Sequence, residues 1–173
     1  MTDDKFWQLI ETSNKASNGQ MEIQAHALAD ELAKLPAEEI ADFDRIYGKF
    51  IDQAYNWDMW GAVFIIVGGC SDDGFNDFLS WLISRGRDIY MTVREDVEKL
   101  ADGIDIPYDE NIPFPFFEEL EYVAGLVYQE KTGDEIPDNE LDLPLEPAGE
   151  EWAEEDELAK RFPKVWAKFG NRG

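Results

Sequence analysis

Cysteine, histidine and long hydrophobic runs are nearly absent from the chain of 173 residues. A single cysteine, Cys70, excludes an intramolecular disulfide and is typical of a reducing compartment. The longest uncharged apolar stretch, from Met59 to Cys70, contains three glycines and is too short to span a bilayer as a helix. The first residues are acidic where a secretory signal would be basic, so we expect a cytoplasmic protein.

Lysine and arginine are scarce: the chain has 15 of them against 39 aspartates and glutamates, a formal net charge of −24. Residues 1–129 hold 26 acidic and 9 basic residues, and residues 130–157 hold 13 acidic residues and one lysine. The sign reverses only in residues 158–173, which hold five basic residues and no acidic one. This field repels phosphate backbones and anionic lipid, so we expect neither nucleic acid nor membrane as a partner. It attracts basic proteins and cations, although acidity also serves solubility alone.

Helical periodicity dominates the first half of the chain. Hydrophobic residues make up 44 % of the sequence and aromatic residues 13 %, which is enough for a packed core. Apolar residues at spacings of three and four predict helices, with capping residues before them and Gly or Pro after them. We therefore predict an all-α single domain of about six to eight helices. The early helices are expected near residues 3–18, 21–35, 37–55, 57–67, 72–85 and 90–100.

The segment from Trp57 to Val67 is apolar on nearly all sides, which is typical of a buried helix. Its composition would also suit a strand at residues 64–67, but the helical neighbours favour a helix. We expect this element to lie at the centre of the fold. The helices that wrap it are expected to be those at 21–35, 37–55 and 72–85.

Proline and acidic residues mark the later part of the chain. Three prolines in residues 104–117 predict a loop, which a helix follows up to Thr132. Three more prolines lie among acids in residues 133–149. The chain therefore divides into a helical core domain (1–132), an acidic proline-containing linker (133–149) and a C-terminal helical segment (150–173). We expect the C-terminal segment to dock back on the core.

The carboxylates at the start of the helix expected over residues 72–85 are the best candidate site. Asp73 and Asp77 stand four residues apart on one helix face, and Asp72 and Asn76 form a second such pair. With further carboxylates they would suit Mg²⁺ or Ca²⁺, which makes the three aspartates candidate catalytic and binding residues. The structural alternative is a helix start capped by Ser71, where first-turn acids contribute about 0.3–1 kcal/mol each.

Cys70 precedes a helix start, where the pKa of a thiol can be lowered. A nucleophilic cysteine would need a base, and His26, the only histidine, lies in a different helical segment. We therefore favour an inert, buried cysteine and a partly exposed histidine. The sequence has no nucleophile elbow, phosphate loop or dinucleotide fingerprint, and we predict neither a metal site nor a cofactor.

A second candidate binding surface lies in the C-terminal segment. Trp152 either docks internally or anchors a partner, as buried aromatics do in interfaces. The acids that follow it can form a phosphate-like surface for a basic protein; they include Glu154, Glu155 and Asp156.

Several motifs resemble the bacterial family known as "domain of unknown function 4240". The most specific is GGCSDDGF at residues 68–75, and others are FW at 6–7, WDMWG at 57–61 and WLI at 81–83. The tail at residues 162–170 fits more weakly. Leu79 and Ser80 stand where the family pattern has an arginine and a small residue. The resemblance covers roughly residues 5–130 plus the tail, and it implies a bacterial helical domain without supplying an activity.

Three readings of the function remain. The favoured one is a stoichiometric binding protein, such as an immunity or inhibitor protein that neutralises a basic toxin or enzyme. The alternative is a metal-dependent enzyme centred on Asp72, Asp73 and Asp77, and a regulatory accessory domain is a third reading. The oligomeric state has no signature in the sequence.

Overall fold

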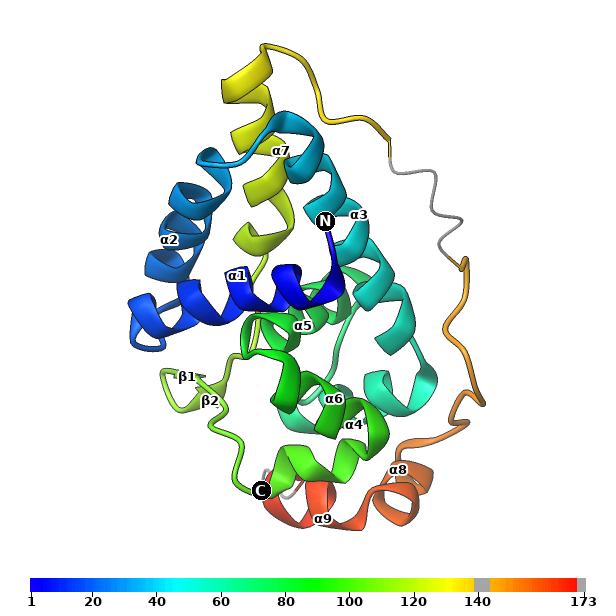
Figure 1. Ribbon diagram of the computed structural model, residues 1–173. Coiled ribbons are helices and arrows are strands. Elements are labelled where there is room, and N and C mark those ends of the chain that lie inside the picture. Colours follow the sequence, from blue (N-terminus) through cyan, green and yellow to red (C-terminus); the bar gives the residue numbers. More distant parts are fainter. Residues whose placement is uncertain (139–143, 171–173) are drawn as a thin grey trace.

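A computed structural model describes residues 1–138 and 144–170 (Figure 1). Over these residues the chain is mainly helical, which confirms the all-α prediction. The first five helices are α1 (Asp3–Ser17), α2 (Met21–Ala33), α3 (Ala37–Ala54), α4 (Trp57–Val67) and α5 (Asp72–Ser84). They are followed by α6 (Arg87–Glu95), the 3₁₀ helix η1 (Val97–Ala101), strands β1 (Tyr108–Asp109) and β2 (Ile112–Pro113), and α7 (Glu119–Thr132). The C-terminal elements are α8 (Glu155–Arg161), α9 (Pro163–Val165) and the π-helical turn η2 (Trp166–Gly170).

The helices begin and end where the local chemistry dictates. Thr2, Asn56 and Ser71 each accept a backbone N–H from the first turn of the helix that follows, at 3.3, 2.9 and 3.2 Å. Asn18 ends α1 and Gly68 ends α4, both in the left-handed conformation that releases a helix C-terminus. These caps explain why the predicted bounds of the first five helices lie close to the observed ones. The helix predicted near residues 90–100 is instead divided at Asp96 into α6 and η1.

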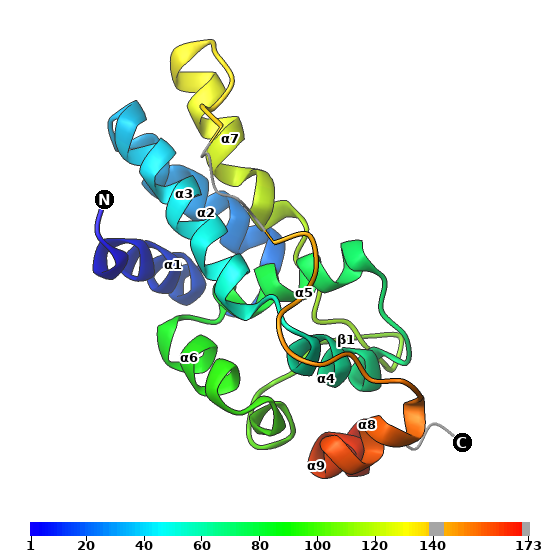
Figure 2. The same cartoon turned by 90° about the vertical axis from the view of Figure 1, so that its right-hand side faces the viewer.

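Helix α5 lies at the centre of the fold and packs against α1, α3, α4, α6 and α7. Its second half is buried on all sides, from Phe78 to Ser84. The prediction that α4 occupies this place is wrong. Helix α4 lies nearer one end of the molecule, and its apolar character has another cause: the C-terminal segment covers the side that the core leaves open (Figure 2).

The C-terminal segment docks back on the core, as predicted, and the structure places the contact on α4 and η1. The contact is close at Gly61 of α4, where an added Cβ would lie 2.8 Å from Leu158 and 3.0 Å from Phe162. The side chain of Trp152 packs edge-on against Trp57, with 5.5 Å between ring centroids. A glycine at this position therefore lets α8 approach the α4 backbone.

Polar contacts join the C-terminal segment to η1. The carboxylate of Glu98 accepts the backbone N–H groups of Lys164 and Val165, each at 2.9 Å. Lys164 forms an ion pair with Asp102, and Lys168 donates to the carbonyl of Ala101. The basic end of the chain is thus held by the acidic core.

The predicted linker and loop contain some regular structure. Ala148 forms a parallel bridge with Asn56, through hydrogen bonds between Trp57 N and Ala148 O and between Ala148 N and Tyr55 O. Residues 139–143 of the linker lie outside the described residues. In the 104–117 loop, β1 and β2 form a hairpin that the sequence analysis missed, and its turn has positive φ at Glu110 and Asn111. An asparagine at a turn was the available signal.

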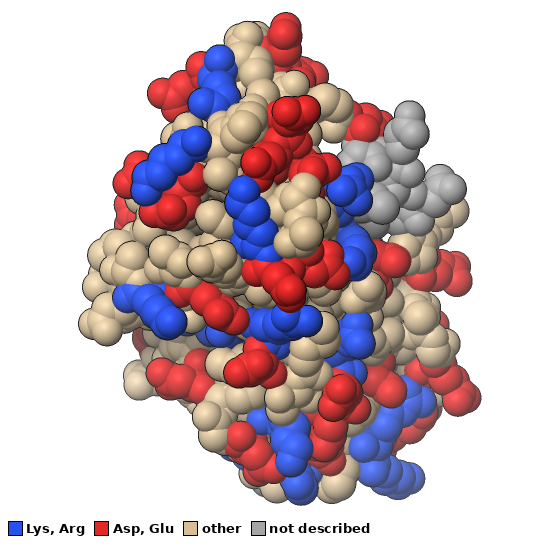
Figure 3. Space-filling view, viewed as in Figure 1, with Lys and Arg blue, Asp and Glu red and all other residues tan. Residues whose placement is uncertain are grey.

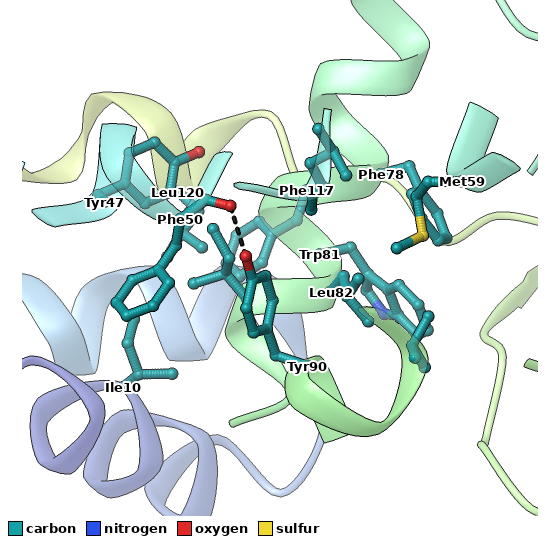
Figure 4. Packing of buried hydrophobic residues seen from close by; sticks show 14 of the residues in the cluster. Ile10, Tyr47, Phe50, Met59, Phe78, Trp81, Leu82, Tyr90, Phe117 and Leu120 are labelled. Atoms are coloured by element: carbon teal, nitrogen blue, oxygen red, sulfur yellow. Dashed lines mark hydrogen bonds between the residues drawn. The ribbon is translucent and has the colours of Figure 1, made fainter. Parts of the chain in front are cut away.

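Buried hydrogen bonds fix the core packing. The hydroxyl group of Tyr90 donates to the backbone carbonyl of Phe50 at 2.6 Å, and Figure 4 shows this contact among the surrounding aromatic and aliphatic side chains. Gln24 of α2 is fully buried and donates to the carbonyl of Ser84 at 2.9 Å. These contacts join α2, α3 and α6 to the central helix or to each other.

Lysine and arginine side chains alternate with carboxylates on the face drawn in Figure 3. The ion pairs of the fold include Lys5 with Glu39, and Arg87 with Asp4. Within residues 1–138 and 144–170, no helix has the length and apolar character needed to cross a bilayer.

Candidate functional site

A groove with a volume of about 460 Å³ lies between α3 and α7 and is floored by α5. We call it the α3/α7 groove. Apolar side chains with high exposure lie along it: Tyr122 is 52 % exposed and Leu126 is 63 % exposed. The residues that line it are Asp44, Tyr47, Gly48, Ile51, Asn76, Ser80, Glu121, Tyr122, Gly125, Leu126 and Ile136.

The floor of the groove carries a buried polar pair. The hydroxyl groups of Tyr47 and Ser80 lie 2.5 Å apart, and Ser80 donates to the carbonyl of Asn76 at 3.0 Å. Burial raises the pKa of Tyr47 well above its usual value, so the phenol stays protonated. The floor therefore offers neutral hydroxyl groups and adds no charge of its own.

Five carboxylates, from three helices and the residue before α7, either line the groove or act electrostatically on Glu121, which lines it. We call them the acidic rim: Asp44, Asp73, Asp77, Glu118 and Glu121. Burial raises the pKa of Glu121, and the charges of the other four raise it further. Burial also raises the pKa of Asp77, with repulsion from Glu118 and Asp73 added. Among the described residues that line the groove, none is basic. A cation that enters would relieve this repulsion.

Asp77→Asn should stabilise the folded chain at pH 7 by about 0.5 kcal/mol, because it removes repulsion between like charges four residues apart on a helix. The pKa of Asp77 in the folded chain lies above its usual 3.8. The penalty of its charge is therefore present above the folded pKa and disappears as the pH falls below 3.8.

Urea unfolding at pH 7 and below pH 3.8 would test this sign, since the gain from Asp77→Asn should be present only at pH 7. Asp109→Asn, at an exposed position in β1, is the matched control. A loss of stability at pH 7, or the same gain in the control, would contradict the account of the rim.

The structure divides the three predicted aspartates. Asp73 and Asp77 belong to the acidic rim. Asp72 acts on Tyr55 and Cys70: burial raises the pKa of both groups, and the charge of Asp72 raises each further, together with that of Asp77 in the case of Cys70. Ser71 caps α5, as expected if these residues form a helix start. Asp72 and Asp73 are both exposed in the first turn of α5. In the described part of the chain, no group of three or more His, Cys, Asp or Glu side chains is arranged to hold a metal ion. The metal-enzyme hypothesis thus finds no ligand set there.

Cys70 and His26 show no sign of acting together. Burial raises the pKa of the Cys70 thiol to about 12, with Asp77 and Asp72 adding to the shift. The thiol is therefore protonated at neutral pH, which makes it a poor nucleophile. His26 is exposed, and its Nδ1 lies 2.8 Å from the carbonyl oxygen of Glu22 on the same helix.

The candidates in the C-terminal segment lie away from the groove. Trp152 docks internally, against Trp57 and Phe64. Glu154, Glu155 and Asp156 are exposed at the start of α8. Both views place α7 at one end of the molecule and α8 at the other (Figures 1 and 2). The exposed acids at the start of α8 therefore lie far from the α7 wall of the groove.

Sequence reasoning missed most of the groove. The sequence analysis identifies none of Tyr47, Tyr122, Leu126 and Ile136 as a candidate site residue. The available signal was an apolar run, Val123-Ala124-Gly125-Leu126-Val127-Tyr128, that continues around α7 instead of keeping to one face. Such a run predicts a helix that is covered on all sides, so the exposure of Leu126 marks a surface that the fold leaves uncovered.

The comparisons with known proteins give one match. A family model described as "Protein of unknown function (DUF4240)" matches residues 1–130. The matched part holds every residue that lines the groove except Ile136. No curated protein and no solved structure gives a significant match.

Proposed function

The chain belongs to DUF4240, a family of proteins of unknown function, and we propose that it is a binding protein whose α3/α7 groove receives a basic segment of a partner protein. The observation that carries the proposal is the coincidence of two features. Exposed apolar side chains line the groove, and carboxylates with raised pKa values stand beside them.

The apolar part of the groove supplies contact area. Tyr122 and Leu126 lie on the same side of α7, four residues apart, and expose more than half of their surface. Burying apolar surface contributes roughly 25 cal/mol per Å², and aromatic side chains are frequent anchors in interfaces. Gly48 and Gly125 leave room for an approaching backbone or side chain.

The carboxylates at the groove favour a partner segment with positive charge. Glu121 and Asp77 are partly desolvated and repel their neighbours, so an arginine or lysine placed between them would gain attraction and remove repulsion. A net charge of −24 would also speed the encounter with a basic protein. We therefore expect rapid association that weakens as salt is added.

An amphipathic helix is the partner segment that fits best. Such a helix lays apolar residues into a groove and places its charged residues at the edge. A complex of this kind is stoichiometric and masks the basic surface of the partner. It suits an immunity or inhibitor protein for a basic toxin or enzyme, which is the form of the proposal that we favour.

Leu126→Arg is expected to reduce capture of the partner at least tenfold, because it places a cation and a long side chain in the groove. The full chain would be immobilised and exposed at low salt to an extract of its native cell. The amount of each captured basic protein would then be compared between the variants by mass spectrometry.

Leu145→Arg is the matched control, since it makes the same change of charge and size at a leucine that is 98 % exposed. Capture by this variant should equal that of the unchanged chain, and raised salt should release the partner. If both arginine variants capture the same proteins equally well, the groove is not the binding site.

A further inference from the structure

A second cavity, of about 210 Å³, meets α5 at Trp81 and at its C-cap residue Arg85, whereas the groove meets it at Asn76 and Ser80. The second cavity is enclosed by the turn between α1 and α2, the end of α5, α6 and the segment 104–107. Its walls are mostly apolar and include Met21, Trp81, Ile89 and Pro107. One cation, Arg85, lines it, together with Asn14 and Asp105.

Arg85 is held in place by neutral acceptors. Its Nε donates to Ser84 Oγ at 3.1 Å, and its Nη2 donates to Gln24 Oε1 at 2.7 Å. Gln24 is itself fully buried and fixed by its bond to the carbonyl of Ser84. These bonds occupy the edge of the guanidinium formed by Nε and Nη2, and they fix its plane before any ligand arrives.

The charge of Arg85 is not neutralised by contact. Within the described residues no carboxylate forms an ion pair with it, although the chain has 39 acids. Burial lowers the pKa of Arg85, and the field of Asp105 only partly offsets that effect. A partly desolvated guanidinium group that no carboxylate contacts raises the free energy of the folded chain. A bound carboxylate that contacts Arg85 would lower it.

We propose that this cavity binds a small carboxylate with a short apolar body, whose carboxylate contacts Arg85 and whose body lies against Met21, Trp81 and Ile89. The volume limits the ligand to a few carbon atoms beyond the carboxylate. Two sources share this chemistry, a branched short-chain acid and an apolar α-amino acid. The ammonium group of the amino acid would face Asp105. The site is independent of the α3/α7 groove.

Calorimetric titration of the full chain with 4-methylpentanoate and with leucine tests the proposal. At least one of them should bind with one-to-one stoichiometry, and 4-methylpentanamide, which has the same shape without the charge, should not bind. If leucine binds more tightly, the preference should disappear in Asp105→Asn, which identifies the amino-acid source. If the acid binds more tightly, the ammonium group is not recognised and the ligand is a simple carboxylate.

Arg85→Gln is expected to weaken binding by about tenfold or more, since a charge-assisted hydrogen bond is lost. Arg87→Gln is the matched control, because Arg87 is exposed and paired with Asp4 outside the cavity. Ile89→Trp provides a second variant that fills the cavity and keeps Arg85, and it should abolish binding with an unchanged circular dichroism spectrum. The proposal is overturned if neither carboxylate binds at ~10 mM, or if the amide or the Arg85→Gln variant binds equally well.

Discussion

Phe78→Ala is expected to lower the free energy of unfolding by about 3–5 kcal/mol, the usual cost of removing a buried phenyl ring. Phe78 is fully buried in α5, and its ring lies 5.6 Å from that of Trp81. Because α5 packs against five other helices, the cavity left behind has little freedom to collapse. The melting temperature should fall by roughly 10 °C.

Urea unfolding followed by tryptophan fluorescence would measure the loss, with Phe114→Ala as the matched control at a phenylalanine that is 44 % exposed. The control should lose less than about 1 kcal/mol. Comparable losses in the two variants would contradict the central position of α5.

Leu158→Ala is expected to detach the C-terminal segment from α4 at a cost of about 2–4 kcal/mol to its docking. Leu158 is fully buried and meets the face of α4 at Gly61, where no side chain intervenes. Trp152 and Phe162 pack at the same place, so the loss of one of the three should loosen the other two. Limited proteolysis should then cut within residues 150–170, while the core resists.

Leu145→Ala makes the same substitution at a leucine that is 98 % exposed, in the same part of the chain. Its digestion pattern should match that of the unchanged chain. Protection of residues 150–170 in the Leu158→Ala variant would show that the polar contacts from Glu98 hold the segment without the apolar ones.

Local chemistry made the early helices predictable. A hydroxyl, amide or glycine stands at most of their ends, and such residues act within one turn. The family was predictable for the same reason, since GGCSDDGF is a contiguous run within the matched residues 1–130. The hairpin at residues 108–113 was missed because two-residue strands give no periodic pattern.

The position of α4 could not be read from its own residues. An all-apolar sequence predicts that a helix is covered on every side, but it does not identify the segments that cover it. The segment that covers it lies some ninety residues later in the chain, and it approaches only because Gly61 has no side chain. That contact depends on tertiary packing, which no local pattern encodes.

The candidate site was predicted in part. Asp73 and Asp77 were identified from their spacing, and both belong to the acidic rim. Glu121 reaches the site on α7, Glu118 from the residue before α7, and Asp44 on α3. The exposure of Leu126 depends on which face of α7 packs on the core. The apolar part of the groove could therefore be identified only from the folded structure.

The most direct test of the groove is a nuclear magnetic resonance titration of the ¹⁵N-labelled full chain with a helical peptide that carries leucines on one face and lysines on the other. The account predicts that the largest shift changes occur at the amides of Gly48, Asn76, Tyr122 and Leu126, and that Leu126→Arg removes them. Changes centred on the exposed acids at the start of α8, or spread evenly over the acidic surface, would contradict it.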